Sequence, residues 1–457
     1  MASDTPSDDA LPSARRYEGP VWGRLPGRRP ARVQPAEAAA PSTADLANHR
    51  LAKPVLFFLI TLIIPFIISL GPLRLSVYRI ILLVMIVPML VAWLSGKAGR
   101  IRLPDIFFLL LCAWAALSFA IVHGPQVAIE GGGIFFIETM GAYLLARCYI
   151  RTAEDFRKMT IVLFSIVLFL LPFAIVEAVT GRNVLLDFFD SVMRSYGRVM
   201  KDPRWGLNRV QATFEHPILF GVFCGSAIAL AYMVVGYGRS FFARAWRALA
   251  VLFTAALCLS SGPLTGMVAQ FLLIGWNGAL SAFKARWTLL VGLVVSALVA
   301  LEIVANRSAP AIFISYFSFN EFSAYMRIHI WNFGTASIWN HPFIGIGLNE
   351  WERPFWMSPS IDMFWIVFGV RHGLPAQLFM LGGFLSVFLS LSFLRCPDPR
   401  LSAYRLAILI CLTGLFLTGW TVHYWNATYA LFMFLIGSGV WLLDTAPEDE
   451  PARGRRR

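Results

Sequence analysis

Charged residues are scarce in this sequence. Asp, Glu, Lys and Arg make up 14% of its 457 residues, whereas a typical soluble domain has about 25%. Hydrophobic residues make up 58% of the chain. This composition argues against a soluble multidomain enzyme and indicates a protein of the lipid bilayer.

Several sequence patterns that carry well-known chemistry are also missing. There is no GxxxxGK[ST] loop to cradle nucleotide phosphates and no paired DxD motif for a metal, so we expect no cofactor and no metal site. The net charge of +13 is not gathered on a soluble surface beside stacking aromatics, because the aromatic residues lie mostly in apolar blocks. A nucleic-acid partner is therefore not expected.

Cysteine is infrequent, and its placement does not support a disulfide framework. The six cysteines fall in apolar blocks or in loops that we expect in the cytoplasm: Cys112, Cys148, Cys224, Cys258, Cys396 and Cys411. The first 53 residues, rich in Pro, Ala and Arg, contain no apolar segment of the kind found in a cleavable signal peptide. We expect them to form a disordered cytoplasmic extension.

Apolar blocks of about 18 to 22 residues dominate the rest of the chain, and each is long enough to cross a hydrocarbon core of roughly 30 Å. Backbone polar groups in such runs are satisfied in lipid only by helices. The sequence therefore predicts an all-α polytopic membrane bundle over 54–443. Its twelve expected spans are 54–71, 77–94, 104–122, 131–150, 159–178, 216–236, 246–261, 263–281, 286–305, 374–394, 403–421 and 424–443.

Basic residues in the short connections indicate the orientation. If the N-terminus is cytoplasmic, the inner connections carry fifteen Lys and Arg residues, while the short outer ones carry only Arg74, with Arg79 just inside a span. Both termini, including a charged tail at 444–457, are then expected in the cytoplasm.

Two long connections, about 179–215 and 306–372, fall on the outer side of this topology. Together they hold ten basic residues: Arg182, Arg194, Arg198, Lys201, Arg204, Arg209, Arg307, Arg327, Arg353 and Arg371. Long loops are exempt from the positive-inside rule, so these residues can be ordinary solvated surface. The alternative is a binding site for an anionic substrate at the outer membrane face.

The second loop contains a segment at 318–331 whose apolar and polar residues alternate with helical spacing, so we expect a helix at the membrane surface. Arg327 and Trp331, four residues apart, would share one face. Arg327 can be a snorkelling surface residue or a guanidinium directed at phosphate oxygens. A turn follows at 341–347 (HPFIGIG), beginning with His341.

Two further segments lead into expected spans. Arg209 lies a few residues before the span at 216–236. The simplest interpretation is that Arg209 anchors this segment at the membrane interface. The stretch 360–375 is too short to span and is predicted to be interfacial or re-entrant. It carries Asp362, Arg371 and His372, and Asp362 can either accept a proton from a hydroxyl or pair with an arginine.

Taken together, these segments resemble the bacterial O-antigen ligase and polysaccharide polymerase superfamily. In that family an Arg precedes a small-residue and Pro segment at a helix start, as Arg209 does here. A later loop carries Arg, three residues and Trp, then a Pro and Gly-x-Gly turn, which Arg327, Trp331 and the 341–347 turn match. The family's His-Asn pair is replaced by Asp362 and Met363, although Gly373 keeps the spacing.

The resemblance implies a glycosyltransferase of the bacterial inner membrane that works at the periplasmic face in surface polysaccharide synthesis. Such enzymes transfer an oligosaccharide from undecaprenyl diphosphate to a glycan acceptor, and other polysaccharide assembly proteins are further candidate partners. Arg209, Arg327 and Asp362 are then the candidate catalytic residues. Candidate substrate-binding residues are Arg371, His341, His372 and Trp331, with Arg371 a third possible ligand of the diphosphate and the two histidines alternative bases.

Other functions stay open at this point. Because Asp362 replaces the His that many ligases carry, a polymerase is slightly favoured over a ligase acting on lipid A-core. A flippase for the same lipid-linked oligosaccharide would also handle the diphosphate. Transporters usually place ionisable groups near the membrane midplane in repeated halves, whereas this chain concentrates its charge in two unequal outer loops.

Overall fold

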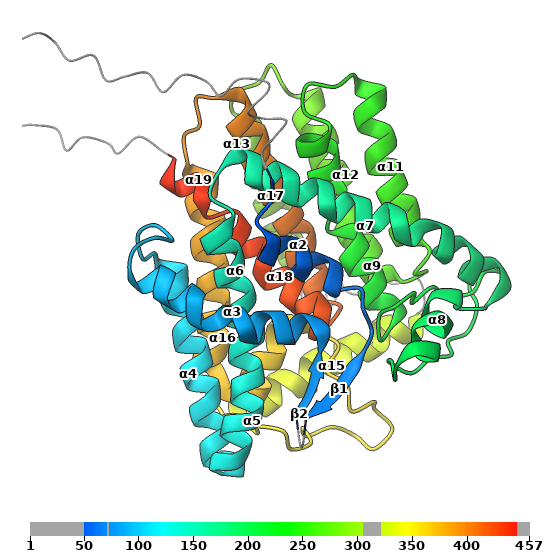
Figure 1. The fold of residues 1–457 in the computed structure, drawn as a ribbon, viewed down its shortest axis with the longest axis vertical. Helices are drawn as coiled ribbons and strands as arrows, with labels where there is room; N and C mark the ends of the chain where they lie inside the picture. The colour runs from blue at the N-terminus through cyan, green and yellow to red at the C-terminus, as the bar shows by residue number, and fades with distance from the viewer. Residues whose placement is uncertain (1–49, 71–72, 305–320, 446–457) are drawn as a thin grey trace, which may run out of the picture. The chain divides into compact units, whose positions relative to one another are not determined.

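The computed structural model describes residues 50–70, 73–304 and 321–445. Most of these residues are helical, which confirms the all-α prediction apart from one short hairpin (Figure 1). Most of the expected N-terminal extension, the charged tail beyond Thr445 and the start of the second long loop lie outside the described residues.

Nine helices of the described chain are long and apolar enough to cross a membrane, and this marks a multi-pass membrane protein. They are α3 (Val77–Leu94), α4 (Leu103–His123), the run from α5 (Pro125–Phe136) through η1 (Ile137–Gly141) to α6 (Ala142–Tyr149), α7 (Ala153–Thr180), the run from α9 (Pro217–Gly225) through α10 (Ile228–Leu230) to η2 (Ala231–Val235), α13 (Arg286–Val304), α16 (Phe364–Phe393), α17 (Pro399–Gly419), and α18 (Asn426–Ser438) with α19 (Trp441–Asp444).

Each of these nine coincides with an expected span, but the total of twelve is not confirmed. The expected span at 246–261 is α11 (Phe241–Ala256), whose 16 residues rise only about 24 Å. The span at 263–281 is α12 (Ser261–Ala279), which is long enough but includes four glycines and the polar Thr265, Gln270 and Asn277. Both helices form where the sequence predicts them.

The prediction of a first span over 54–71 is wrong. Helix α2 (Lys53–Thr61) has nine residues, and the chain then forms an antiparallel hairpin of β1 (Ile67–Leu70) and β2 (Leu73–Ser76), in which Ile67 pairs with Ser76. Pro65 lacks the N–H that a continuing helix would need. The β-branched Ile67 and Ile68 favour a strand.

The core lies around two central runs of helix. The run from α9 to η2 and the run from α18 to α19 are almost wholly buried, whereas no residue of 286–303 in α13 is buried. Helix α4 packs against α5 and α16, and α12 packs against α17. The central runs begin at Pro217 and Asn426, so the loops that precede them are anchored to the most buried part of the bundle.

The two long connections are partly helical. The first contains α8 (Val184–Val192), and the second contains α15 (Glu321–Asn340), which confirms the helix expected around Arg327 and extends it. The segment expected to be re-entrant forms the first part of α16, separated from the long part by a non-helical break at Gly373. The break directly precedes the expected span at 374–394, so the sequence places the start of that span correctly.

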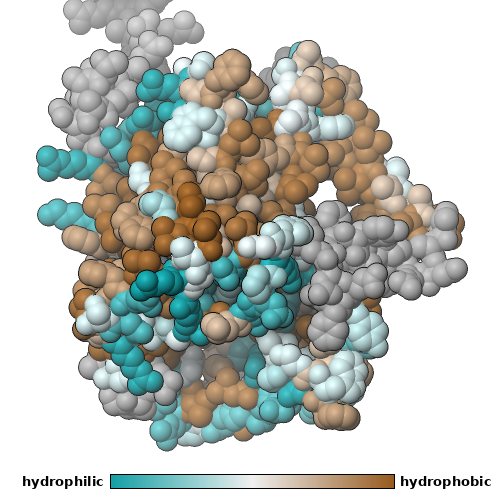
Figure 2. Space-filling model, turned by 90° about the vertical axis from the view of Figure 1, so that its right-hand side faces the viewer, coloured by the Kyte–Doolittle hydropathy of each residue, from teal (hydrophilic) through white to brown (hydrophobic). Residues whose placement is uncertain are grey.

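Charged residues from several helix ends meet at one end of the bundle. The carboxylate of Asp444 accepts from Arg102 Nη2 at 2.5 Å, from Arg151 Nη1 at 2.9 Å and from Arg147 Nη1 at 3.4 Å. Figure 2 shows hydrophobic side chains in a broad band over the upper part of the face in view, with hydrophilic side chains gathered below around a recess. The apolar band is the surface expected to face lipid.

Candidate functional site

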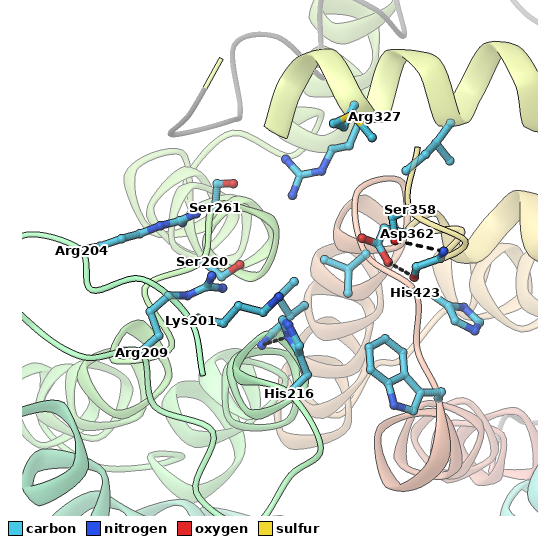
Figure 3. A pocket seen from close by; sticks show the side chains of 16 residues that line it. Lys201, Arg204, Arg209, His216, Ser260, Ser261, Arg327, Ser358, Asp362 and His423 are labelled. Atoms are coloured by element: carbon cyan, nitrogen blue, oxygen red, sulfur yellow. Dashed lines mark hydrogen bonds between the residues drawn. The ribbon is translucent and has the colours of Figure 1, made fainter. Parts of the chain in front are cut away.

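A cavity of about 550 Å³ brings together residues from both long connections (Figure 3). Its charged lining consists of four cations, Lys201, Arg204, Arg209 and Arg327, against one carboxylate, Asp362. The remaining lining residues are His216, Ile218, Ser260, Ser261, Met326, Ile330, Ser358, Ser360, Val422, His423 and Trp425. We call this space the first cavity, and its charge suits an anionic ligand.

Backbone carbonyls hold two of the arginines. Arg204 Nη1 donates to the carbonyl of Leu259 at 2.8 Å, and Arg209 Nε donates to the carbonyl of Cys258 at 3.3 Å. Among the described residues no carboxylate lies within salt-bridge distance of either guanidinium. Carbonyl dipoles orient these side chains without neutralising them, so both charges remain for a ligand.

The turn that supplies these carbonyls is strained. Leu259 lies between α11 and α12 with a φ of 47°, a conformation that costs a non-glycine residue on the order of 1–3 kcal/mol. Such outliers cluster at functional sites, where the surrounding structure maintains them. Here the strained residue presents its carbonyl to Arg204.

Arg327 enters the first cavity from α15. Its side chain is 8% exposed, and its Nε donates to the carbonyl of Thr421 at 3.2 Å. Burial lowers the pKa of Arg327 to about 10, against an opposing influence of Asp362. The guanidinium therefore stays charged at neutral pH. Its hydrogen bond to Thr421 holds it just past the end of α17.

Asp362 lies just before α16 and is fixed by its neighbour. The hydroxyl of Ser360 donates to Asp362 Oδ1 at 2.5 Å. Its charge raises the pKa of Arg327, so the two groups influence each other across the first cavity. Figure 3 shows Asp362 and Arg327 extending into this space from different elements.

Two histidines of the first cavity are neutral at pH 7. Burial, with the cations Lys201 and Arg209 nearby, lowers the pKa of His216 to about 4. Burial and the charge of Arg371 do the same for His423. Because His216 Nδ1 accepts the backbone N–H of Ile218 at 3.1 Å, the proton of its neutral ring is on Nε2.

A second, smaller cavity adjoins the first. Its volume is about 260 Å³, and its lining includes Arg371, His372 and Glu138 as well as His423 and Trp425, which also line the first cavity. Arg371 Nη1 donates to the carbonyls of Gly347 at 2.9 Å and Asn349 at 3.3 Å. We call this space the second cavity.

The structure divides the expected site residues into three groups. Arg209, Arg327 and Asp362, which are far apart in sequence, all line the first cavity. Arg371 and His372 line the second cavity, where His372 Nδ1 lies 3.1 Å from the hydroxyl of Ser118.

The other two expected residues line neither cavity. The ring of Trp331 packs on Trp420 with centroids 6.1 Å apart. His341 is exposed, 3.9 Å from a carboxylate oxygen of Glu352.

Sequence reasoning did not single out several residues of the first cavity. Lys201 and Arg204 were only two of ten basic residues in the outer loops, with nothing in the local pattern to distinguish them. His423 and Trp425 lie in the short connection between α17 and α18, whereas the expected topology put Trp425 inside the span at 424–443 and His423 just before it. The available sequence signal was a His and a Trp two residues apart at the start of an expected span.

The arrangement can bind a polyanion while keeping a carboxylate and neutral imidazoles beside it. No group of three or more His, Cys, Asp or Glu in the described chain has the geometry to hold a metal ion. Neither a scan against protein-family models nor a search of curated proteins finds a match to this chain.

Proposed function

We propose that this protein is a membrane glycosyltransferase of the O-antigen ligase and polymerase type. It uses undecaprenyl-diphosphate-linked oligosaccharide at the periplasmic face of a bacterial inner membrane, with both termini in the cytoplasm. The observation that carries the proposal is the convergence of Arg204, Arg209 and Arg327 with Lys201 in a cavity that contains one carboxylate. These cations come from two loops expected on the same side of the membrane.

The chemistry follows from the charge that develops during transfer. An acceptor hydroxyl attacks the anomeric carbon of the donor sugar, and the bond from that carbon to the diphosphate oxygen breaks. Its electron pair leaves with the diphosphate, so negative charge grows on that oxygen. Guanidinium groups fixed beforehand stabilise this charge at little cost in reorganisation.

The proton of the attacking hydroxyl also needs an acceptor. Asp362, which lines the first cavity and is held by Ser360, is the candidate base. Because a diphosphate is a good leaving group, stabilising its charge can drive much of the reaction, and a strong base is not required. The replacement of the family's His by Asp362 is compatible with this chemistry and favours the polymerase branch.

The first prediction concerns two arginines. Arg209→Ala and Arg327→Ala should each lower transfer about 10- to 150-fold, since a charge-assisted hydrogen bond contributes about 1.5–3 kcal/mol. The measurement is polymer formed in cells at equal amounts of membrane-inserted protein. Arg239→Ala, which removes an exposed arginine between η2 and α11, is the matched control and should leave product unchanged. Wild-type polymer in both cavity variants would refute the proposal.

The polymerase and ligase alternatives differ in the products of a deletion strain. Loss of a polymerase leaves single repeats on the acceptor. Loss of a ligase leaves long chains on the carrier lipid. We expect single repeats, in line with the Asp362 replacement.

A further inference from the structure

The second cavity has a different chemical character from the first. Apolar and aromatic side chains form most of its wall, among them Phe119, Phe135, Val367, Phe368 and Tyr429. The rings of Phe135 and Tyr429 are nearly parallel, with an interplanar angle of 13° and centroids 6.2 Å apart. Aromatic faces carry partial negative charge and pack well against the C–H faces of a sugar ring.

The second cavity carries less charge than the first. Its wall holds one cation, Arg371, and one carboxylate, Glu138. Glu138 Oε1 accepts from Tyr78 at 2.5 Å and from Arg79 Nε at 2.9 Å, so this carboxylate is already neutralised. With Glu138 paired to Arg79, Arg371 is the remaining cation of this wall, against four cations in the first cavity. A polyanion therefore gains less here, whereas a sugar ring suits the aromatic wall and can accept a hydrogen bond from Arg371.

The size of the second cavity limits its ligand. Pockets for drug-sized molecules usually measure about 300–1,000 Å³. At about 260 Å³ the second cavity falls just below this range and suits a sugar unit of one or two rings. The shared residues His423 and Trp425 set its boundary with the first cavity, so a ligand in one is next to a ligand in the other.

The local backbone departs from regular geometry where the second cavity is built. Glu138 lies in η1, a single π-helical turn of the kind often found at functional sites. Asn426 has a φ of 50° and joins two charged groups, because its Oδ1 accepts from Arg79 at 2.6 Å and its Nδ2 donates to Glu215 at 2.7 Å. The hydrogen-bonded chain from Glu138 through Arg79 and Asn426 thus ends at Glu215, the residue directly before His216 of the first cavity.

We infer that the second cavity is the acceptor subsite, which holds the sugar ring whose hydroxyl attacks the donor bound in the first cavity. The inference rests on the proposed function. His423 and Trp425 then act as positioning residues that guide the attacking hydroxyl across the shared boundary. The new bond joins the acceptor oxygen to the donor anomeric carbon, the diphosphate departs with the old bonding pair, and Asp362 takes the hydroxyl proton.

Filling the second cavity tests this inference. In Val367→Trp the indole occupies the space assigned to the sugar ring. The probes are the repeat-unit oligosaccharide freed from the carrier lipid by mild acid, and undecaprenyl diphosphate. With full-length protein in nanodiscs, calorimetry should show oligosaccharide binding weakened at least about tenfold, the effect of losing a well-packed contact region. Binding of undecaprenyl diphosphate should stay within about twofold of wild type.

Two further variants control the experiment. Val291→Trp makes the same exchange at an exposed position of α13, outside both cavities, and should leave both affinities unchanged. Phe135→Leu removes an aromatic face without adding volume and should also weaken oligosaccharide binding. This variant provides the test if Val367→Trp does not fold.

Different results would overturn the acceptor subsite and the proposed function. Wild-type oligosaccharide affinity in both Val367→Trp and Phe135→Leu, with intact diphosphate binding, overturns the acceptor subsite and leaves the proposed function standing. Absence of diphosphate binding in the wild-type protein would overturn the proposed function. Whether the second cavity binds a sugar would still be decided by comparing oligosaccharide affinity in wild type and the second-cavity variants.

Discussion

At the scale of single residues, His216 links helix geometry to the electrostatics of the first cavity. It is the N-cap of α9, where its Nδ1 accepts the backbone N–H of Ile218. That hydrogen bond requires an unprotonated Nδ1, and burial beside Lys201 and Arg209 keeps the ring neutral. Protonation would remove the cap and add a like charge beside the cations.

The pKa of His216 gives a prediction about stability. Its pKa is about 4 in the folded protein and about 6.5 in an unfolded chain. Between these values the unfolded state binds a proton that the folded state does not, so stability falls as the pH is lowered through this window. The expected slope is at most about 1.4 kcal/mol per pH unit for this site.

His216→Asn tests the prediction because asparagine caps a helix well and does not titrate. The measurement is the Tm of purified protein in detergent between pH 7 and pH 4.5. We expect a shallower fall for the variant than for wild type, because the His216 contribution to the slope is removed. Parallel curves would show that His216 does not titrate in this window.

Residue identities predicted part of the first cavity. Arg209, Arg327 and Asp362 were selected because their spacing resembles a known family pattern, and they converge in space. Arg204 was not separable from the other loop arginines, since its role depends on a carbonyl of Leu259, 55 residues away. Contacts of this kind depend on the tertiary fold and leave no periodicity in the sequence.

At the scale of elements, the break in α16 organises the second cavity. Leu374 N–H donates to the carbonyl of Pro342 at 2.7 Å, and Ile346 N–H donates to the carbonyl of Val370 at 3.0 Å. The 341–347 turn thus satisfies backbone groups that a continuous helix would have paired. Gly373 makes the break possible with a φ of 82°.

Gly373→Ala should therefore destabilise the protein and reduce transfer. A Cβ at this position would overlap the carbonyl oxygen of Phe343, and the positive φ costs a further 1–2 kcal/mol or so. We expect a lower Tm and less polymer than wild type. Gly292→Ala is the matched control, because nothing lies near its added methyl group on α13, and it should be neutral or slightly stabilising. Equal Tm values for the two variants would contradict this role of the break.

The lengths of the apolar runs predicted most of the helices, but they did not predict the hairpin of β1 and β2. The run at 54–71 has the hydropathy of a span, yet Pro65 and the β-branched pair after it end the helix early. Ile67 N–H donates to the carbonyl of Arg194 at 3.2 Å, and the ring of Phe66 packs on Phe189. These partners belong to the first long connection, so local sequence alone could not reveal them.

At the scale of the whole membrane unit, charge is separated between two regions with different tasks. Around Asp444, Arg102, Arg147 and Arg151 have a carboxylate partner, which joins the ends of α4, α6 and α19. In the first cavity, Arg204 and Arg209 are held only by carbonyls within the described chain. Paired arginines stabilise the bundle, whereas carbonyl-held arginines remain able to bind an anion.

Binding of undecaprenyl diphosphate to the full-length protein in nanodiscs tests the central claim most directly. The comparison is wild type with Arg204→Gln/Arg209→Gln and with Arg327→Gln, and with Arg239→Gln as a control that removes a charge outside the first cavity. We predict Kd values at least about tenfold higher for both cavity variants, unchanged affinity for the control, and weaker wild-type binding at high salt. Equal affinity in all four proteins would contradict the account.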